Sequence, residues 1–305
     1  FNNLKALTPG MFGYSILRSS LESPFFNDLF DSLSKFDIPV EGLHTETGPG
    51  VYEAAILYDE ILPAADRATL FKTSVKEIAY RHEIIASFMA KWSKDLPGCS
   101  GHVHQSLWNM KKTSNLFYNK SDKHGMSELM KSYVAGQLYC LPHILPMFAP
   151  TINSFKRLVE GAWAPTTLTW GVDNRTTALR VLSSSSKAAR LETRVPGSDT
   201  NPYITMAASL ASGLYGIENK LKLKQPNTLG NGYRDFKYGK LPNSLEEATK
   251  AMRKSKLANA LFGSEFVDHF LITREWEYRN YNKQVKKKSK TAISNWELKR
   301  YFEII

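Results

Sequence analysis

The chain has 305 residues, enough for one large domain or two and for a sizeable hydrophobic core. Its hydrophobic content of 42% is ordinary for a globular protein, while its net charge of +11 favours anionic partners. Basic aromatic repeats, zinc knuckles and recognition-helix patterns are absent, so nucleic acid is not expected as a partner. No apolar run reaches the roughly 18 residues of a membrane span, so a membrane is not expected either. Cys99 and Cys140 are most simply free thiols of a reducing, cytoplasmic compartment.

Helix signals occur at five places along the chain, at residues 23–33, 66–82, 201–217, 244–252 and 264–281. In the first, Ser23 is expected as N-cap, with Pro24 at the first helical position. In the fourth, Ser244 and Glu247 have the spacing of a capping box. The basic run from Lys286 to Lys290 is expected to be a solvated loop, and its role stays open.

Extended segments are expected between these helices, at residues 41–46, 50–57, 84–92, 102–108, 167–171, 177–182 and 190–195. Because strands and helices come in clusters, the pattern favours an α+β fold over a strict βαβ series. No repeat or low-complexity linker divides the chain. One compact domain over residues 1–305 is therefore the predicted organisation.

Several of these segments place ionisable side chains on one face, because side chains of a strand alternate with a period of two. The sequence GHVHQSL puts His102, His104 and Ser106 on one face. The sequence RLETRV does the same for three further residues, with an apolar opposite face: Arg190, Glu192 and Arg194. The latter pattern predicts a sheet that lines a polar cavity.

The segments near residue 50 add His44 and Glu46 on one face of a strand and Glu53 on the next segment. Carboxylates with one or two imidazoles suit Mg²⁺ or Mn²⁺ better than structural zinc. Many arginines beside hard metal ions suit phosphoryl transfer from ATP, although the chain has neither a P-loop nor a Rossmann glycine pattern. Spacing alone does not exclude roles other than metal binding: a glutamate on a strand could be solvated, and His44 could be structural.

Three blocks, in order, resemble the catalytic domain of the glutamine synthetase family. They are LPGCSGHVHQSLW, FAPTINSFKRLVEGAWAPTTLTWGVDNRTTALRV and ARLETRVPGSDTNPYI. The resemblance implies a catalytic domain in which a curved antiparallel sheet lines the site and helices pack around it. It also implies a homo-oligomeric ring, in which sites form between subunits.

The resemblance also implies a role for each matching residue. The implied metal ligands are Glu46, Glu53, His102 and Glu192. The implied ATP contacts are His104, Ser106, Arg180, Lys187 and Arg190. The implied glutamate contacts are Arg157, Arg194 and Gly98 of the glycine loop, and the implied catalytic residues are Arg175, Arg180 and Trp163.

The implied chemistry is a two-step ligation: ATP phosphorylates the side-chain carboxylate of glutamate, and an amine then attacks the acyl phosphate to give an amide. The family's first two metal carboxylates lie on an earlier strand, and its small β-rich N-terminal domain contributes to the neighbouring subunit's site. Neither is found in this chain, so as given it is not expected to form the complete site. Pro97 also stands where the family has an asparagine before the glycine loop.

A further departure concerns the acceptor. Trp163 occupies the flap position where glutamine synthetases have a glutamate, and Ala162 replaces an aromatic residue. A neutral indole neither binds nor deprotonates ammonium, whereas its aromatic face suits a larger alkyl-ammonium group. We therefore expect an ATP-dependent ligase that joins glutamate to an organic amine. The alternatives are a glutamine synthetase that uses ammonia and a non-catalytic relative that serves in assembly.

Overall fold

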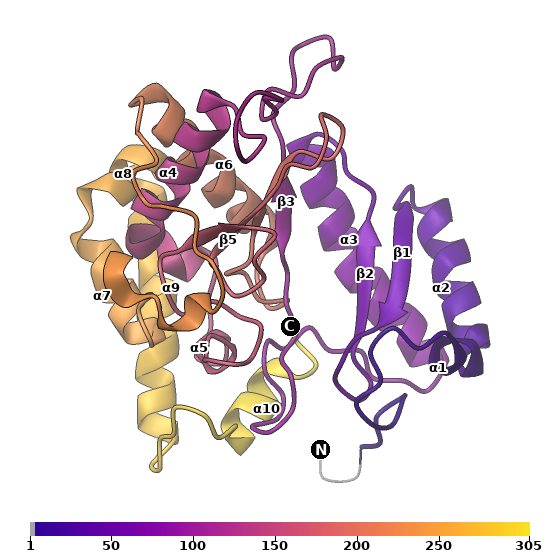
Figure 1. Ribbon diagram of the computed structural model, residues 1–305. Coiled ribbons are helices and arrows are strands. Elements are labelled where there is room, and N and C mark those ends of the chain that lie inside the picture. Colours follow the sequence, from indigo (N-terminus) through magenta and orange to yellow (C-terminus); the bar gives the residue numbers. More distant parts are fainter. Residues whose placement is uncertain (1–3) are drawn as a thin grey trace. The chain divides into compact units, whose positions relative to one another are not determined.

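The computed structural model describes residues 4–305, which form two compact units (Figure 1). The first unit comprises the chain up to Cys99 together with residues 201–203 and 291–305. The second comprises residues 100–200 and 204–290. Both contain helices and a small sheet, so the predicted α+β class is confirmed.

The first unit packs helices against a two-stranded antiparallel sheet. Its elements are α1 (Ile16–Leu21), α2 (Ser23–Lys35), β1 (Val40–Thr45), β2 (Tyr52–Ile56), α3 (Ile61–Arg81) and α10 (Asn295–Tyr301). The amphipathic helix α2 buries Phe25, Phe26, Leu29 and Leu33 in a core that also contains Ile78 of α3. This core covers one face of β1 and β2, and the ionisable residues near position 50 lie on the opposite face.

The second unit surrounds a four-stranded sheet with helices. The strands are β3 (Val103–Gln105), β4 (Trp170–Val172), β5 (Leu179–Leu182) and β6 (Arg190–Thr193), in the order β3-β6-β5-β4. The pairs β3–β6 and β5–β6 are antiparallel, as the resemblance implied, but β4–β5 is parallel, so the sheet is mixed. The helices are α4 (Glu128–Ile144), α5 (Ser154–Arg157), most of α6 (Pro202–Glu218), α7 (Leu245–Lys254), α8 (Lys256–Phe262) and α9 (Ser264–Gln284).

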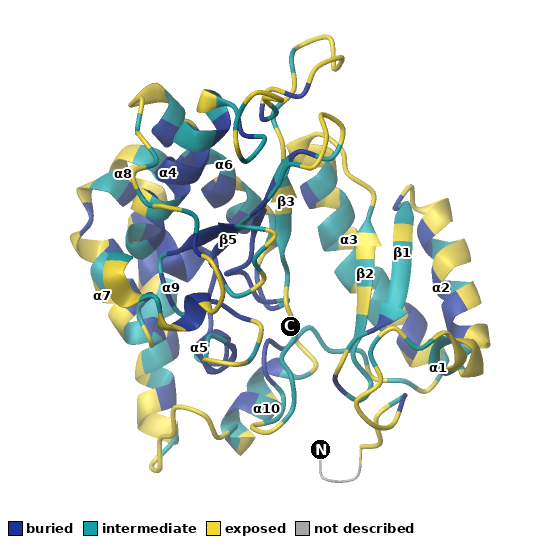
Figure 2. Cartoon of the chain, in the orientation of Figure 1, coloured by how far each residue is buried: buried dark blue, intermediate teal, exposed yellow. Residues whose placement is uncertain are grey.

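Burial in the second unit is concentrated where the sheet meets these helices (Figure 2). Leu179 and Val181 of β5 and Leu191 of β6 are fully buried on the helix side. Because side chains alternate, the residues between them point to the opposite face of the sheet. That face carries the predicted polar residues.

Some local expectations were wrong. Residues 84–92 form no strand: the Phe88 N–H donates to the Ile305 carbonyl and the Ala90 carbonyl accepts from the Cys99 N–H, and these separate bonds do not make a ladder with a neighbouring strand. Glu22, not Ser23, is the N-cap of α2, because α1 ends at that residue. At α7, Ser244 accepts from the Glu247 N–H as predicted, but the Glu247 carboxylate accepts from the Asn243 N–H, so half of the capping box forms.

Two other expectations are confirmed. Cys99 and Cys140 are both free thiols. The run from Lys286 to Lys290 is exposed and lies outside any helix or strand. Within residues 4–305, no helix is long and apolar enough to cross a membrane.

Candidate active site

The polar face of the second unit's sheet is organised by strand register. His104 of β3 lies opposite Glu192 of β6, and Glu192 lies opposite Arg180 of β5. The three side chains therefore form a row across three neighbouring strands, with His102 and Arg194 flanking it on the same face. The two imidazoles and the Arg-x-Glu-x-Arg segment, which the resemblance groups, therefore lie on one face of the sheet.

Glu192 is the centre of this face. Its side chain is 2% exposed, and its carboxylate accepts from Arg194 and, at 2.9 Å, from Nη1 of Arg180. Nδ1 of His102 lies 3.1 Å from one carboxylate oxygen, and Nε2 of His104 lies 3.9 Å from it. Burial opposes ionisation of this carboxyl, but the His102 hydrogen bond and the surrounding positive charge more than offset it and hold its pKa well below the usual range.

The two histidines are neutral bases at physiological pH. Burial lowers the pKa of His102 to about 4, against the raising effect of Glu192. Burial also lowers the pKa of His104, and nearby arginines add to the effect. Neutral imidazole is the form of histidine that binds metal ions, so both side chains are in a suitable state at neutral pH.

The arginines of this face fall into two groups by exposure. Arg190 is partly exposed, and its Nε donates to Nδ1 of His104 at 3.0 Å. Arg194 is 4% exposed and, besides Glu192, donates to the carbonyls of Arg175 (3.1 Å) and Trp163 (3.2 Å). Arg194 therefore ties β6 to two loops of the same unit.

Arg157, predicted as a glutamate contact, is 1% exposed. Its guanidinium donates to the carbonyls of Val195 (2.9 Å) and Arg194 (3.2 Å) and to the Ser100 hydroxyl (2.8 Å). It also lies 3.5 Å from Nε2 of His102. In this structure Arg157 holds the end of β6 beside His102, and its contact with glutamate stays a prediction.

Gly101 explains how the segment before β3 approaches β6. A Cβ atom at this position would lie 2.6 Å from the Gly197 carbonyl oxygen, which is closer than any side chain tolerates. The neighbouring Ser100 and Gly197 form an antiparallel bridge. Only glycine fits there, and this close approach places His102 next to Glu192.

Asp173 belongs to this site, although its sequence position did not indicate a role. It follows β4 with a φ of 48°, is bonded by Nε of Arg180 at 3.0 Å and also contacts Nη2 of that residue. Its contact with Arg180 directs the remaining guanidinium nitrogen to Glu192. The only sequence signal was its place in the DNR triplet beside Arg175.

The flap residue Trp163 is 58% exposed, with a φ of 53° in the left-handed region. Its carbonyl is held by Arg194, so its backbone is fixed while its indole is accessible. Residues 158–165 contain one carboxylate, Glu160, and that carboxylate accepts from Nε of Arg234 at 2.6 Å. The one carboxylate of residues 158–165 is therefore paired with a cation.

The first unit holds a second group of potential metal ligands. One ligand atom from each of three residues lies within 4.8 Å of the others: His44, Glu46 and Glu53. The β1–β2 register makes the group, because His44 pairs directly with Glu53. Glu46 and Glu53 were predicted as ligands from the resemblance; His44 is an addition, since its pairing with Glu53 depends on a register that spacing did not reveal.

Both donor sets fit hard divalent cations. Two ligands at about 2.1 Å in octahedral geometry lie about 3 Å apart, and His102 and Glu192 are separated by 3.1 Å. Carboxylate oxygens with imidazole suit Mg²⁺ or Mn²⁺, and thiolates are absent from both sets. The metal assignments themselves stay predictions.

The other predicted residues are more exposed. Ser106 accepts from the Trp108 indole N–H at 3.0 Å, and Lys187 lies on the exposed loop between β5 and β6. Arg175 is exposed on the loop after β4, and Gly98 lies in the first unit. The structure does not test their predicted roles.

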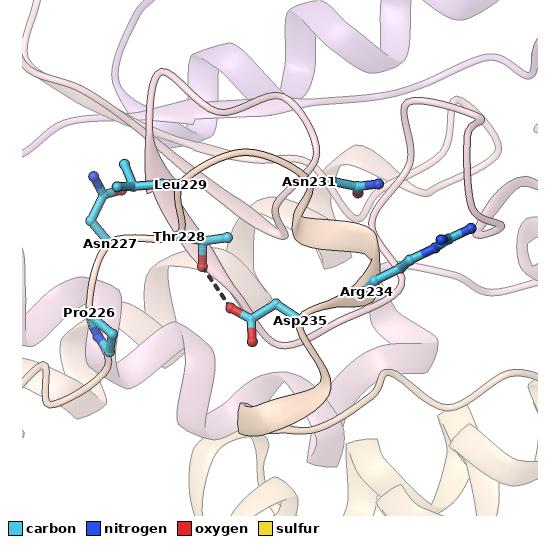
Figure 3. Close-up of a pocket in the computed structure, with 7 residues that line it drawn as sticks. All are labelled: Pro226, Asn227, Thr228, Leu229, Asn231, Arg234 and Asp235. Carbon is cyan, nitrogen blue, oxygen red and sulfur yellow. Dashed lines mark hydrogen bonds between the residues drawn. The ribbon is translucent and has the colours of Figure 1, made fainter.

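A pocket of about 400 Å³ lies elsewhere in the second unit, at residues 226–235 (Figure 3). One of its hydrogen bonds joins Thr228 to Asp235 at 3.3 Å. None of the residues predicted from sequence lines it. It is connected to the candidate site through Arg234, which binds Glu160 of the flap, and through Asn174, whose amide donates to the Thr228 carbonyl at 3.0 Å.

Comparison with known proteins explains this arrangement. The sequence profile of the family described as "Glutamine synthetase, catalytic domain" matches residues 6–301. The chain belongs to this family. The match spans both compact units, and their organisation as one domain stays a prediction.

Three relatives show the range of the family. Type-1 glutamine synthetase 2 of Dictyostelium discoideum is 58% identical, with 100% of this chain and 57% of that protein covered. Glutamate–isopropylamine ligase of a Pseudomonas species is 42% identical, with 96% and 62% covered. A gamma-glutamylethanolamide synthetase of Streptomyces coelicolor is 37% identical, with 99% and 62% covered.

Among solved structures, the one titled "GmaS/ADP complex" matches with a TM-score of 0.81 at 28% identity, covering 98% of this chain and 68% of that chain. This match confirms the predicted fold. The chain spans 57–62% of the length of the three curated relatives named above.

Proposed function

We propose that the full-length protein is an ATP-dependent ligase that joins the γ-carboxylate of glutamate to an organic amine through a γ-glutamyl phosphate. Membership of the glutamine synthetase family supports the ligase class. Of two relatives, the one at 42% identity is named for an organic amine, isopropylamine, and the one at 37% identity is named for an amide product, γ-glutamylethanolamide. The observation that favours an organic amine as acceptor is the exposed indole of Trp163 in the flap, at the position where glutamine synthetases have a carboxylate.

The predicted site residues have distinct tasks in this reaction. Arg180 and His104 lie in one row of the sheet and Arg190 contacts His104, and these three side chains would bind the phosphates of ATP. His102 and Glu192 would hold one divalent cation, and Glu46 and Glu53 another, with His44 beside them. When bound, such cations neutralise charge on the transferring phosphoryl group. Arg175 would add positive charge from its exposed loop, and Lys187 would contact the nucleotide.

The flap sets the acceptor through charge and shape. Ammonium needs a carboxylate to bind and to lose its proton, but Glu160 is already paired with Arg234 at 2.6 Å. A cation over an aromatic ring gains about 0.5–2 kcal/mol, which ammonium shares, and an alkyl-ammonium group adds the apolar contact of its alkyl chain with the indole. Differential binding therefore favours the larger amine.

A direct competition tests this proposal. Full-length protein with ATP, Mg²⁺ and glutamate is given equal concentrations of ammonium and ethylamine, and the products are counted by mass spectrometry. We expect γ-glutamylethylamide to exceed glutamine at least about tenfold, since one methylene in a hydrophobic pocket is worth about 1–3 kcal/mol. Glutamine as the main product at neutral and mildly alkaline pH contradicts the organic-amine proposal.

The second candidate is a glutamine synthetase that uses ammonia. The relative at 58% identity favours it, because it is named as a type-1 glutamine synthetase. The same competition separates the two candidates, since it reports which amide is made. Assembly into a homo-oligomeric ring stays a prediction in either case.

A further inference from the structure

The back of the strand pair β3–β6 carries a buried polar network that the proposed chemistry does not use. Gln105 of β3 lies between His104 and Ser106, and Thr193 of β6 lies between Glu192 and Arg194. Because side chains alternate, both point away from the candidate site, toward the helices. Thr193 is fully buried, and a polar group in such a place needs partners.

The partners form a closed ring of three side chains. Gln105 Nε2 donates to Thr193 Oγ1 at 2.8 Å, and Thr193 donates to Gln137 Oε1 at 2.7 Å. The amide of Gln137 then donates from Nε2 back to Gln105 Oε1 at 2.7 Å. Each donor meets an acceptor in one direction around the ring. Turning the Gln105 amide over would place two donors face to face, and turning the Gln137 amide over would place two acceptors face to face.

Two helices anchor the ring. Gln137 and Tyr133 both come from α4; the Tyr133 hydroxyl donates to Gln105 Oε1 at 2.7 Å, and Gln137 Nε2 also donates to the Ser209 carbonyl of α6 at 2.8 Å. Tyr133 and Gln137 are each 1% exposed. The Tyr133 ring lies against Gly213 of α6, where a Cβ atom would come within 2.1 Å of it. The ring therefore connects both strands to a tightly packed helix pair.

We infer that the Gln105–Thr193–Gln137 ring is a positioning device that holds His104 and Glu192 in register for metal and nucleotide binding. The bond from Gln105 to Thr193 crosses from β3 to β6, directly behind the pair that it aligns. A slip of one residue would turn Glu192 to the helix side and Thr193 to the site. The ring opposes that slip, because Thr193 would lose both of its buried partners. This inference rests on the proposed metal role of Glu192.

Thr193 offers a matched set of variants. Thr193→Val keeps the shape and removes the hydroxyl, while Thr193→Ser keeps the hydroxyl. Thr249→Val is the control: Thr249 is 1% exposed in the same unit, and its hydroxyl donates to the Leu245 carbonyl of its own helix α7. All three are made in the full-length protein, with Glu192→Gln as the reference for loss of the metal ligand.

Two measurements are made on each variant: the dissociation constant for Mn²⁺ by calorimetry and amide hydrogen exchange in peptides that cover β3 and β6. We expect Thr193→Val to raise the Mn²⁺ dissociation constant of the site lost in Glu192→Gln roughly tenfold, the range found when partners of ligands are removed. Exchange in β3 and β6 should also become faster. Thr193→Ser and Thr249→Val should keep Mn²⁺ affinity within about twofold of the unmutated protein, since the ring survives in both.

Each other outcome is decisive. Mn²⁺ affinity that falls in Glu192→Gln but not in Thr193→Val overturns the positioning role alone, even if exchange becomes faster, because the ring is then only structural. Unchanged exchange in β3 and β6 of Thr193→Val overturns the role of the ring in strand pairing. Unchanged Mn²⁺ affinity in Glu192→Gln overturns the proposed metal role, and this inference falls with it.

Discussion

Glu192→Gln should lower the rate of phosphate release from ATP on the order of 10³-fold, which is the scale of loss when one preorganised electrostatic contact is removed. The carboxylate is 2% exposed and is the common acceptor of Arg180 and Arg194. The amide keeps the size of the side chain but removes the charge that a divalent cation requires. A coupled phosphate assay at saturating glutamate and amine measures the loss.

The same change should destabilise the protein, because Arg180 and Arg194 lose their shared anion. Removing one partner of a buried ion pair typically costs about 3–5 kcal/mol. Activity must therefore be measured at a temperature where circular dichroism shows the variant folded. Glu246→Gln serves as the control, since Glu246 pairs with Lys250 at 2.7 Å on the surface of α7. Retention of most phosphate release by folded Glu192→Gln would contradict its role as a metal ligand.

Arg157→Ala should have the second largest effect, with a loss of about 3 kcal/mol in the free energy of unfolding. Its guanidinium is 1% exposed and donates to two buried carbonyls, those of Arg194 and Val195. Removal leaves both acceptors without that donor and opens a cavity next to His102. Urea unfolding of the full-length protein measures this loss.

Arg157 also tests the predicted glutamate contact. We expect the KM for glutamate to rise more than the KM for ATP in Arg157→Ala, and Arg157→Lys to recover part of the stability by returning one donor. Arg279→Ala is the matched control, since Arg279 of α9 is exposed and its loss should change stability by less than about 0.5 kcal/mol. Equal rises in both KM values would assign Arg157 to structure alone.

Period-two alternation was enough to predict the polar face of the second unit. It placed His102 and His104 together and Glu192 between Arg190 and Arg194, and the structure shows these side chains on one face. Alternation succeeds there because β6 is buried on its helix side, where Leu191 is fully enclosed. A buried apolar face fixes the register strongly.

Pairing between segments could not be predicted in the same way. His44 meets Glu53 because β1 and β2 pair in a particular register, and Asp173 meets Arg180 because β4 and β5 lie side by side. The segment at residues 84–92 failed for the same reason: it is apolar and extended, but Phe88 bonds the carbonyl of Ile305 and no neighbouring strand. A strand forms only with a pairing partner, and the sequence of the segment itself does not indicate which other segment that partner is.

The identity of the acceptor is most directly tested at Trp163. Phosphate release with ethylamine and with ammonium is compared for the unmutated protein, Trp163→Glu and Trp163→Phe, where phenylalanine keeps an aromatic face without a charge. We predict that Trp163→Glu raises the ratio of the ammonium to the ethylamine kcat/KM at least about tenfold, because a carboxylate binds the small cation and assists its deprotonation. Trp163→Phe should keep the preference for ethylamine. An unmutated protein that prefers ammonium, or a Trp163→Glu variant whose ratio does not move, would contradict the account.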